Sequence, residues 1–141
     1  MSDFSAFFKR NKIKHENLKY VVSADYVDEK GQPIEWEIRR LSTTEDEALR
    51  KSCMKQVKVP GRNVTKTEMD QLLYITKLTV ASIVYPNLND KKLQDEWNVM
   101  GAENLLKEMI APGEYAELTE KVTSHNGFDI TLNELVDEAK N

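Results

Sequence analysis

Cysteine and histidine are scarce in this sequence of 141 residues, and long apolar runs are absent. The single cysteine, Cys53, cannot form an internal disulfide, which favours a cytoplasmic protein. The histidines, His15 and His125, are far apart in the sequence, so zinc-ligand spacing is missing. No apolar run approaches the ~20 residues that span a bilayer, and the N-terminus places its acid before its bases, unlike a secretory signal. We therefore expect no disulfide, no metal site and no membrane span.

Motifs of catalysis and cofactor binding are missing as well. The sequence contains no GxSxG, P-loop, GxGxxG or HExxH pattern. Cys53 stands beside Met54 in a helical pattern, which is typical of a small core residue rather than a nucleophile. Acidic residues occur in clusters such as Glu45 to Glu47, which are typical of a solvated surface. We predict a protein that is not an enzyme and has no cofactor; a carboxylate site in a polar cleft is the alternative.

The composition is that of an ordinary globular protein, with 40% hydrophobic and 31% charged residues. The length suits a single domain over residues 1–141, which we divide into a short helix plus β-hairpin over 1–42 and a helical body over 43–141. The net charge of −4 is unevenly distributed. Residues 1–85 hold 15 Lys and Arg against 12 Asp and Glu, whereas residues 86–141 hold 5 against 12.

The N-terminal third predicts a helical turn and two strands. Phe4, Phe7 and Phe8 share one face of a short helix over residues 3–9. Strands are predicted over 19–26 and 34–41, since Ile34, Trp36 and Ile38 alternate with charged residues in the second, and a turn with Gly and Pro separates them. We expect these strands to form an antiparallel hairpin.

The rest of the sequence predicts helices. The stretch Ser42 to Glu45 is a capping box that opens a helix over about 43–55, followed by a loop at 59–63. Thr67 is the expected cap of a helix to about residue 85, which is apolar on nearly every side and therefore central and buried. Further helices are predicted over 90–98, 102–110, 112–124 and 131–139. The expected fold class is α+β, predominantly α-helical, with an N-terminal β-hairpin and a compact body of about five or six helices.

Residues 50–66 form a basic segment that contains six Lys and Arg and no acid. Such a block attracts an acidic partner or forms a solvated loop. A small nucleic-acid-binding regulator that uses this segment is the alternative function. However, the segment has no stacking aromatic, and the pI near 5.3 is far from that of typical nucleic-acid-binding domains.

Several phrases in a fixed order carry a family resemblance. They are PIEWEIR at 33–39, VYPNL at 84–88, LQD at 93–95, VMGAE at 99–103 and PGEY at 112–115. The chain resembles, from Met1 to Asn141, the tail assembly chaperones of PBSX-type defective prophages, the XkdN-like family, and of related long-tailed phages. The match is least clear around residues 57–66.

The resemblance implies a chaperone in the cytoplasm of the bacterial host. Such chaperones bind the long, aggregation-prone tape measure protein and keep it soluble while the tail tube protein polymerises around it. In many such phages a ribosomal frameshift makes a longer form whose extension is thought to recruit the tail tube protein. Ala139 to Asn141 can be encoded with the slippery heptamer A AAA AAC, so we hypothesise a frameshift there; a non-slippery codon choice would remove this hypothesis.

A surface of methionine and aromatic residues is the expected contact with the partner. Such side chains suit adaptable apolar recognition. The candidates are Trp97, Met100, Leu106, Met109 and Tyr115. Core packing is the alternative for each of them, and self-association is compatible with the sequence.

Overall fold

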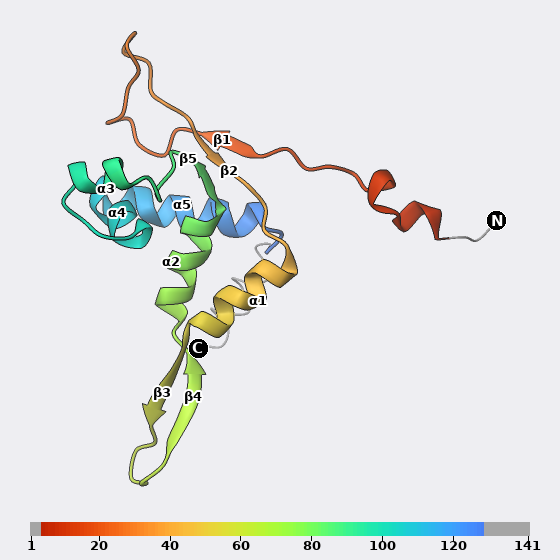
Figure 1. Cartoon of the computed structure of the whole chain (residues 1–141), viewed down its shortest axis with the longest axis vertical. Coiled ribbons are helices and arrows are strands. Elements are labelled where there is room, and N and C mark those ends of the chain that lie inside the picture. The colour runs from red at the N-terminus through yellow and green to blue at the C-terminus, as the bar shows by residue number, and fades with distance from the viewer. Residues whose placement is uncertain (1–3, 129–141) are drawn as a thin grey trace.

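A computed structural model of the chain describes residues 4–128. Within these residues it contains five α-helices, five strands in two sheets and two 3-10 turns. In chain order they are η1 (Ser5–Phe7), η2 (Lys9–Asn11), β1 (Leu18–Tyr20), β2 (Trp36–Ile38), α1 (Thr43–Ser52), β3 (Met54–Lys58), β4 (Thr65–Met69), α2 (Gln71–Ser82), β5 (Ile83–Tyr85), α3 (Lys91–Glu96), α4 (Ala102–Met109) and α5 (Pro112–His125). Figure 1 shows a body around α2 from which the N-terminal segment and the β3–β4 hairpin extend in different directions.

The first sheet has the order β1-β2-β5 and is antiparallel throughout. Tyr20 pairs with Trp36 in β1 and β2, and Ile38 pairs with Ile83 of β5. The predicted alternation in β2 is confirmed, because Trp36 and Ile38 are buried while Glu37 between them is partly exposed. The prediction of a separate N-terminal hairpin is wrong, because β1 and β2 belong to a three-stranded sheet. Its strands are only three residues long, and the third strand comes from the chain that follows α2.

The second sheet is the β3–β4 hairpin, which the sequence prediction missed. A helix end, a loop and a new helix start were expected over these residues. Instead α1 ends at Ser52, and residues 54–58 pair in full register with residues 65–69, from Met54 opposite Met69 to Lys58 opposite Thr65. Valine and threonine residues on both sides of the Pro60-Gly61 turn suit strands. Because the two stretches pair with each other, they form a hairpin in place of the expected helix end and helix start.

The start and end of α2 also differ from expectation. Asp70, not Thr67, caps the helix, and its side chain accepts a hydrogen bond from the Leu73 amide at 3.1 Å. The helix ends at Ser82 because Ile83 to Tyr85 pair with β2. The fold is therefore α+β, but the expected layout, a hairpin followed by a mainly helical body of five or six helices, is wrong.

The central position predicted for α2 is confirmed. The helix packs against α1, α4, α5 and β5. Its buried hydroxyl groups donate to carbonyl groups one turn earlier, as in Thr79 to Ile75 at 2.8 Å and Ser82 to Leu78 at 2.9 Å. These bonds satisfy polar groups that would otherwise destabilise the core. The largest fully buried side chains around them are Trp36, Ile38, Leu78, Leu88, Leu105, Leu106 and Leu118.

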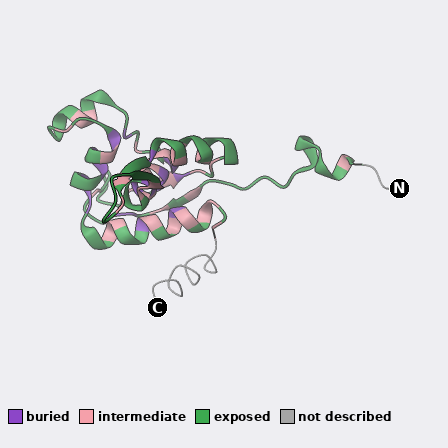
Figure 2. Ribbon diagram, turned by 90° about the horizontal axis from the view of Figure 1, so that it is seen from below, coloured by how far each residue is buried: buried purple, intermediate pink, exposed green. Residues whose placement is uncertain are grey.

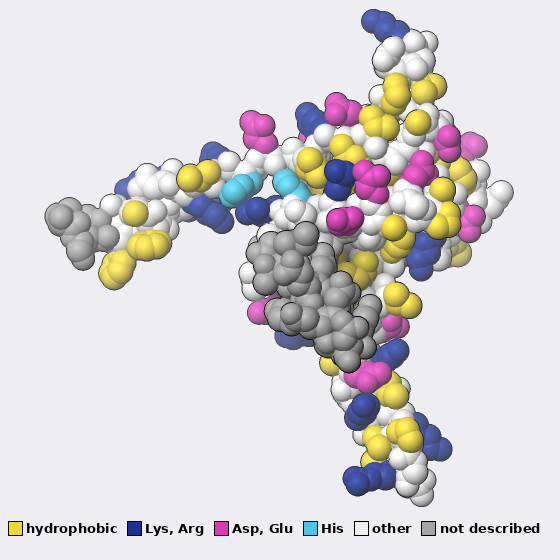
Figure 3. All heavy atoms as spheres, turned by 180° about the vertical axis from the view of Figure 1, so that it is seen from behind, with side chains coloured by type: hydrophobic (Ala, Val, Ile, Leu, Met, Phe, Trp, Pro, Cys, Tyr) yellow, Lys and Arg dark blue, Asp and Glu magenta, His cyan; other side chains and the backbone are white. Residues whose placement is uncertain are grey.

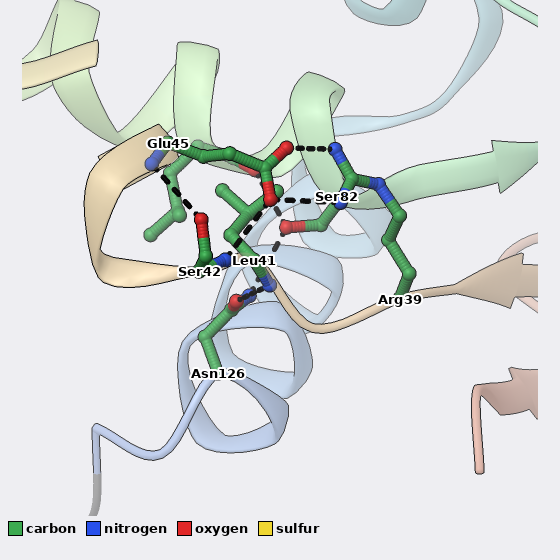
Figure 4. A network of polar contacts seen from close by, with 7 residues as sticks. Arg39, Leu41, Ser42, Glu45, Ser82 and Asn126 are labelled. Carbon is green, nitrogen blue, oxygen red and sulfur yellow. Dashed lines mark hydrogen bonds and ion pairs between the residues drawn. The ribbon is translucent and has the colours of Figure 1, made fainter. Parts of the chain in front are cut away.

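A polar network joins the ends of four elements (Figure 4). The predicted capping box is present, with Ser42 and Glu45 bonded in both directions at the start of α1. Arg39, just after β2, forms two hydrogen bonds to the Glu45 carboxylate, the shorter at 2.7 Å. Asn126, just after α5, accepts from the Leu41 amide at 2.7 Å and donates to the Ser82 hydroxyl at 3.0 Å. The network fixes the ends of β2, α1, α2 and α5 against one another.

The helix predicted at the N-terminus is absent from the structure, whereas the helices predicted after Pro86 are present up to residue 128. The expected helix at 3–9 is wrong: the chain forms two 3-10 turns, and its phenylalanines are exposed. A single isolated turn is too short to stabilise an α-helix. Helices α3, α4 and α5 confirm the predictions at 90–98, 102–110 and 112–124 to within a few residues at each end. The helix predicted over 131–139 lies outside the described residues.

Candidate partner-binding surface

The structure separates the five residues that the sequence grouped as a partner surface. Leu106 and Met109 lie in the hydrophobic core, where they are 0% and 9% exposed. Tyr115 is partly buried. Trp97, at the end of α3, is 37% exposed, and Met100, in the loop before α4, is 87% exposed. The five residues therefore do not form one continuous face, and their contact with a partner stays a prediction.

The apolar stripe of α4 faces inward. Ala102, Leu105, Leu106 and Met109 are its buried residues, and α4 packs against α2. An amphipathic helix buries its apolar stripe wherever a neighbouring apolar face is available. Here that face belongs to the protein's own core.

An open apolar groove lies between the first half of α2 and the helices α4 and α5, and we call it the α2–α5 groove. Its volume is about 640 Å³. Its lining residues are Asp70, Leu72, Leu73, Ile75, Thr76, Lys107, Tyr115, Ala116 and Thr119. Periodicity did not find this groove, because Leu72 and Leu73 have the same pattern as the core residues of α2. Of the predicted surface residues, only Tyr115 lines it.

Two leucines give the groove its exposed apolar character. Leu72 is 83% exposed and Leu73 is 36% exposed, although the helix that carries them also contributes buried residues such as Leu78 to the core. The floor is fixed by a hydrogen bond of 2.7 Å between the hydroxyl groups of Thr76 and Tyr115, which ties α2 to α5. An open surface with exposed leucines is what an amphipathic helix needs to dock its apolar face.

The basic segment 50–66 is divided between the body and the β3–β4 hairpin. Arg50 belongs to the body: its guanidinium forms an ion pair with Asp46 at 2.8 Å and lies 4.6 Å from the centre of the Tyr74 ring. Burial and the hydrogen bond to Asp46 raise the pKa of Tyr74 to about 12. Lys55, Lys58 and Arg62 are exposed on the hairpin, where Figure 3 shows several dark blue side chains.

The other residues considered for chemistry have structural positions. Cys53 is 1% exposed and part of the core, which confirms the prediction for it. His125 ends α5 and lies near His15, and Figure 3 shows the two histidines side by side. Burial, followed by the nearby charges of Arg40 and His15, lowers the pKa of His125. Within residues 4–128, no three His, Cys, Asp or Glu side chains gather as metal ligands, and no helix there is long and apolar enough to cross a membrane.

Comparison with known proteins defines the class. The family model of XkdN-like phage tail assembly chaperone proteins matches residues 4–140, which is nearly the whole chain. The chain belongs to this family.

Two relatives come from Bacillus subtilis strain 168. The phage-like element PBSX protein XkdN is 29% identical over 140 residues, which cover 99% of this chain and 94% of the relative. The uncharacterized protein YqbN is also 29% identical, over 99% of this chain and 93% of its own length. The crystal structure of YqbN superposes with a TM-score of 0.77 at 23% identity, covering 92% of this chain and 99% of that one. This last match supports the fold.

Proposed function

We propose that this chaperone binds the tape measure protein in the bacterial cytoplasm and keeps it soluble during tail assembly, without catalysis. The observation that carries the proposal is the α2–α5 groove with its exposed Leu72. Membership of a tail assembly chaperone family supports a client of this kind, and the groove offers an apolar surface that would suit it.

The groove suits a helical client with an apolar seam. Leu72 and Leu73 would contact apolar side chains that recur every three or four residues along such a helix. Asp70 and Lys107 are the charged residues of the lining and would face polar positions beside the seam. The groove is open, so one chaperone would bind the client weakly. Many copies of the chaperone along a long client would still cover the client. Weak contacts also allow the tail tube protein to displace the chaperone.

Co-expression with the tape measure protein of the same prophage tests the proposal. The readouts are the soluble fraction of the client and the amount that co-purifies with the chaperone. Leu72→Glu would place a charge against the apolar seam and should lower the co-purified client by roughly tenfold. Val27→Glu is the matched control, because Val27 is also an exposed aliphatic residue, 50% exposed, but lies in the loop between β1 and β2. It should retain the client at the wild-type level.

Two results would contradict the proposal. If the wild-type chaperone neither raises the solubility of the client nor co-purifies with it, the function is wrong. If Leu72→Glu binds normally while Met100→Glu loses the client, the client site lies at the α3–α4 junction with Trp97 and Met100, and the assignment to the groove is wrong.

The contact with the tail tube protein would depend on a frameshifted, longer form of the chain. The codons for Ala139 to Asn141 provide the first test. A slippery heptamer followed by an open reading frame supports the longer form, and mass spectrometry of the expressed products would detect it directly.

A further inference from the structure

The β3–β4 hairpin projects from the body and is exposed along most of its length. Figure 1 shows it extending beyond the ends of α1 and α2, and Figure 2, which views the molecule from that end, shows it mostly in the colour of exposed residues. Among the described residues, β3 and β4 pack chiefly against each other. A two-stranded ribbon that the fold leaves uncovered is available to a partner. No residue of the hairpin lines the α2–α5 groove, so this is a separate surface.

The hairpin, residues 54–69, is basic although the chain as a whole is acidic. It carries four Lys and Arg against one acid, whereas the rest of the chain carries 16 against 23. Each strand has five residues, so the turn lies about 17 Å from the body, which is twice the Debye length of about 8 Å at physiological salt. The acids of the body are therefore largely screened at the turn, and the local positive charge favours an anionic partner there.

Three of the four cations on the hairpin are available to an anion. Lys55, Lys58 and Arg62 are exposed and form no ion pair with another described residue. The fourth is paired, since Nζ of Lys66 lies 3.6 Å from the carboxylate of Glu68. The three available cations follow β3 outward into the turn, so they can contact neighbouring phosphate groups of a nucleic acid. Such contacts need no stacking aromatic when the bases stay paired, because stacking is a feature of single-strand binding.

One face of the hairpin carries side chains that form hydrogen bonds. Gln56 lies opposite Thr67 and Lys58 lies opposite Thr65, and because side chains alternate along a strand, these two pairs share a face. All four residues are exposed, and the Gln56 amide nitrogen donates to the Thr67 hydroxyl at 2.8 Å. Beyond the methionine pair at its base, this face has no apolar side chain. It therefore differs from the core of a typical protein–protein interface, which is apolar and poor in charge.

The shape and chemistry of the hairpin match double-stranded DNA. The major groove of B-DNA is about 12 Å wide and admits a two-stranded β-ribbon, and glutamine, lysine and threonine side chains form hydrogen bonds with base edges there. The major groove of an RNA duplex is too narrow for such a ribbon. We propose that the β3–β4 hairpin is a second binding surface, which inserts its polar face into the major groove of duplex DNA and places its three available cations on the phosphates.

Fluorescence anisotropy tests the proposal with the full chain and a labelled DNA duplex of about 20 base pairs, or two helical turns. Wild type should bind with a dissociation constant of roughly 10⁻⁴ M or tighter at about 50 mM salt. Three phosphate contacts predict that binding weakens about 40-fold when the salt is raised to about 200 mM. The hairpin variant Lys55→Ala/Lys58→Ala/Arg62→Ala should bind at least about tenfold more weakly than wild type and lose most of this salt dependence.

A charge-matched variant separates the hairpin from the net charge of the protein. Lys12→Ala/Lys14→Ala/Lys30→Ala also removes three exposed cations, but none of them is on the hairpin. It should bind the DNA duplex within about twofold of wild type. Both variants should keep the circular dichroism of wild type, because all the replaced side chains are exposed. An RNA duplex of the same sequence should bind wild type at least about fivefold more weakly than the DNA duplex.

Four results would overturn the proposal. The first is a wild-type chain that does not bind the DNA duplex at about 50 mM salt. The second is an equal loss of binding in the two triple variants, which would assign the effect to net charge. The third is an RNA duplex that binds as tightly as DNA, and the fourth is poly-glutamate that displaces DNA at equal charge; either would make the hairpin a surface for acidic polymers or proteins in general. Since no client is present, these outcomes are independent of the co-expression test.

Discussion

Replacing Asn126 with alanine should destabilise the protein, although this residue lies just beyond the last turn of α5. Its side chain accepts a hydrogen bond from the Leu41 amide at 2.7 Å and donates to the Ser82 hydroxyl at 3.0 Å. The Asn126 side chain also donates to the Val122 carbonyl, which already accepts a hydrogen bond from the backbone N–H of Asn126. The two long-range bonds therefore determine the effect of the substitution.

The magnitude follows from these two bonds. A hydrogen bond contributes roughly 1 kcal/mol net, and leaving a donor in a partly buried position without a partner costs about 1–3 kcal/mol. The Leu41 amide would lose its partner, whereas Ser82 would still donate to the Leu78 carbonyl. We expect Asn126→Ala to lower the free energy of unfolding by about 2–3 kcal/mol, or the melting temperature by roughly 6–12 °C for a chain of this size.

Urea unfolding followed by circular dichroism and tryptophan fluorescence measures this change, because Trp36 is buried and reports on the core. Asn104→Ala is the matched control: it removes one hydrogen bond, to the Met100 carbonyl, from an exposed position, so we expect a change within about 0.5 kcal/mol. Asn126→Asp keeps the acceptor for the Leu41 amide and should fall between the two. If Asn126→Ala unfolds within about 0.5 kcal/mol of wild type, the network does not stabilise the fold as reasoned.

Three further predictions concern stability. Leu105→Ala, at a fully buried position in α4, should lower the free energy of unfolding by about 2–5 kcal/mol in urea titrations, since it leaves a cavity. Gly101→Ala should cost about 1–3 kcal/mol in the same assay, because Gly101 has a φ of 91° and the space around it is open, so the loss would come from the backbone alone. Glu45→Gln should make stability less dependent on pH between about 5 and 2, measured as thermal midpoints. The hydrogen bond from Arg39 lowers the pKa of Glu45 to about 2, below its unfolded value of about 4.3, so its stabilising effect is full above that value and is lost as the pH falls toward 2.

Local patterns in the sequence predicted much of the secondary structure. The capping box at Ser42 and Glu45, the alternation of Trp36 and Ile38, and the short helices after Pro86 all depend on residues within a few positions of one another. Such features follow from backbone sterics and side-chain spacing, which a sequence states directly. The family resemblance added the class of protein, which depended on several phrases in order and on no single motif.

The elements that the sequence did not predict share a different cause. Residues 54–58 form a strand because residues 65–69 lie beside them, and Ile83 to Tyr85 leave the helical path because β2 offers free hydrogen-bonding groups. A short apolar run is compatible with either a helix or a strand until its neighbour is known. The spacing of Phe4, Phe7 and Phe8 likewise predicted the apolar face of a helix. Among the described residues no neighbouring element covers these side chains, so nothing stabilises a helix there.

The sequence by itself determined that the protein has a hydrophobic core and indicated where most of its helices begin and end. It also showed that the GxSxG, P-loop, GxGxxG and HExxH motifs are absent. Tertiary structure alone decided which apolar residues are available to a partner. Leu106 and Leu72 look alike in periodicity, yet the first is 0% exposed beneath α2 and the second is 83% exposed at the groove. The physical reason is that periodicity specifies a face of a helix, whereas burial depends on whether another element packs against that face.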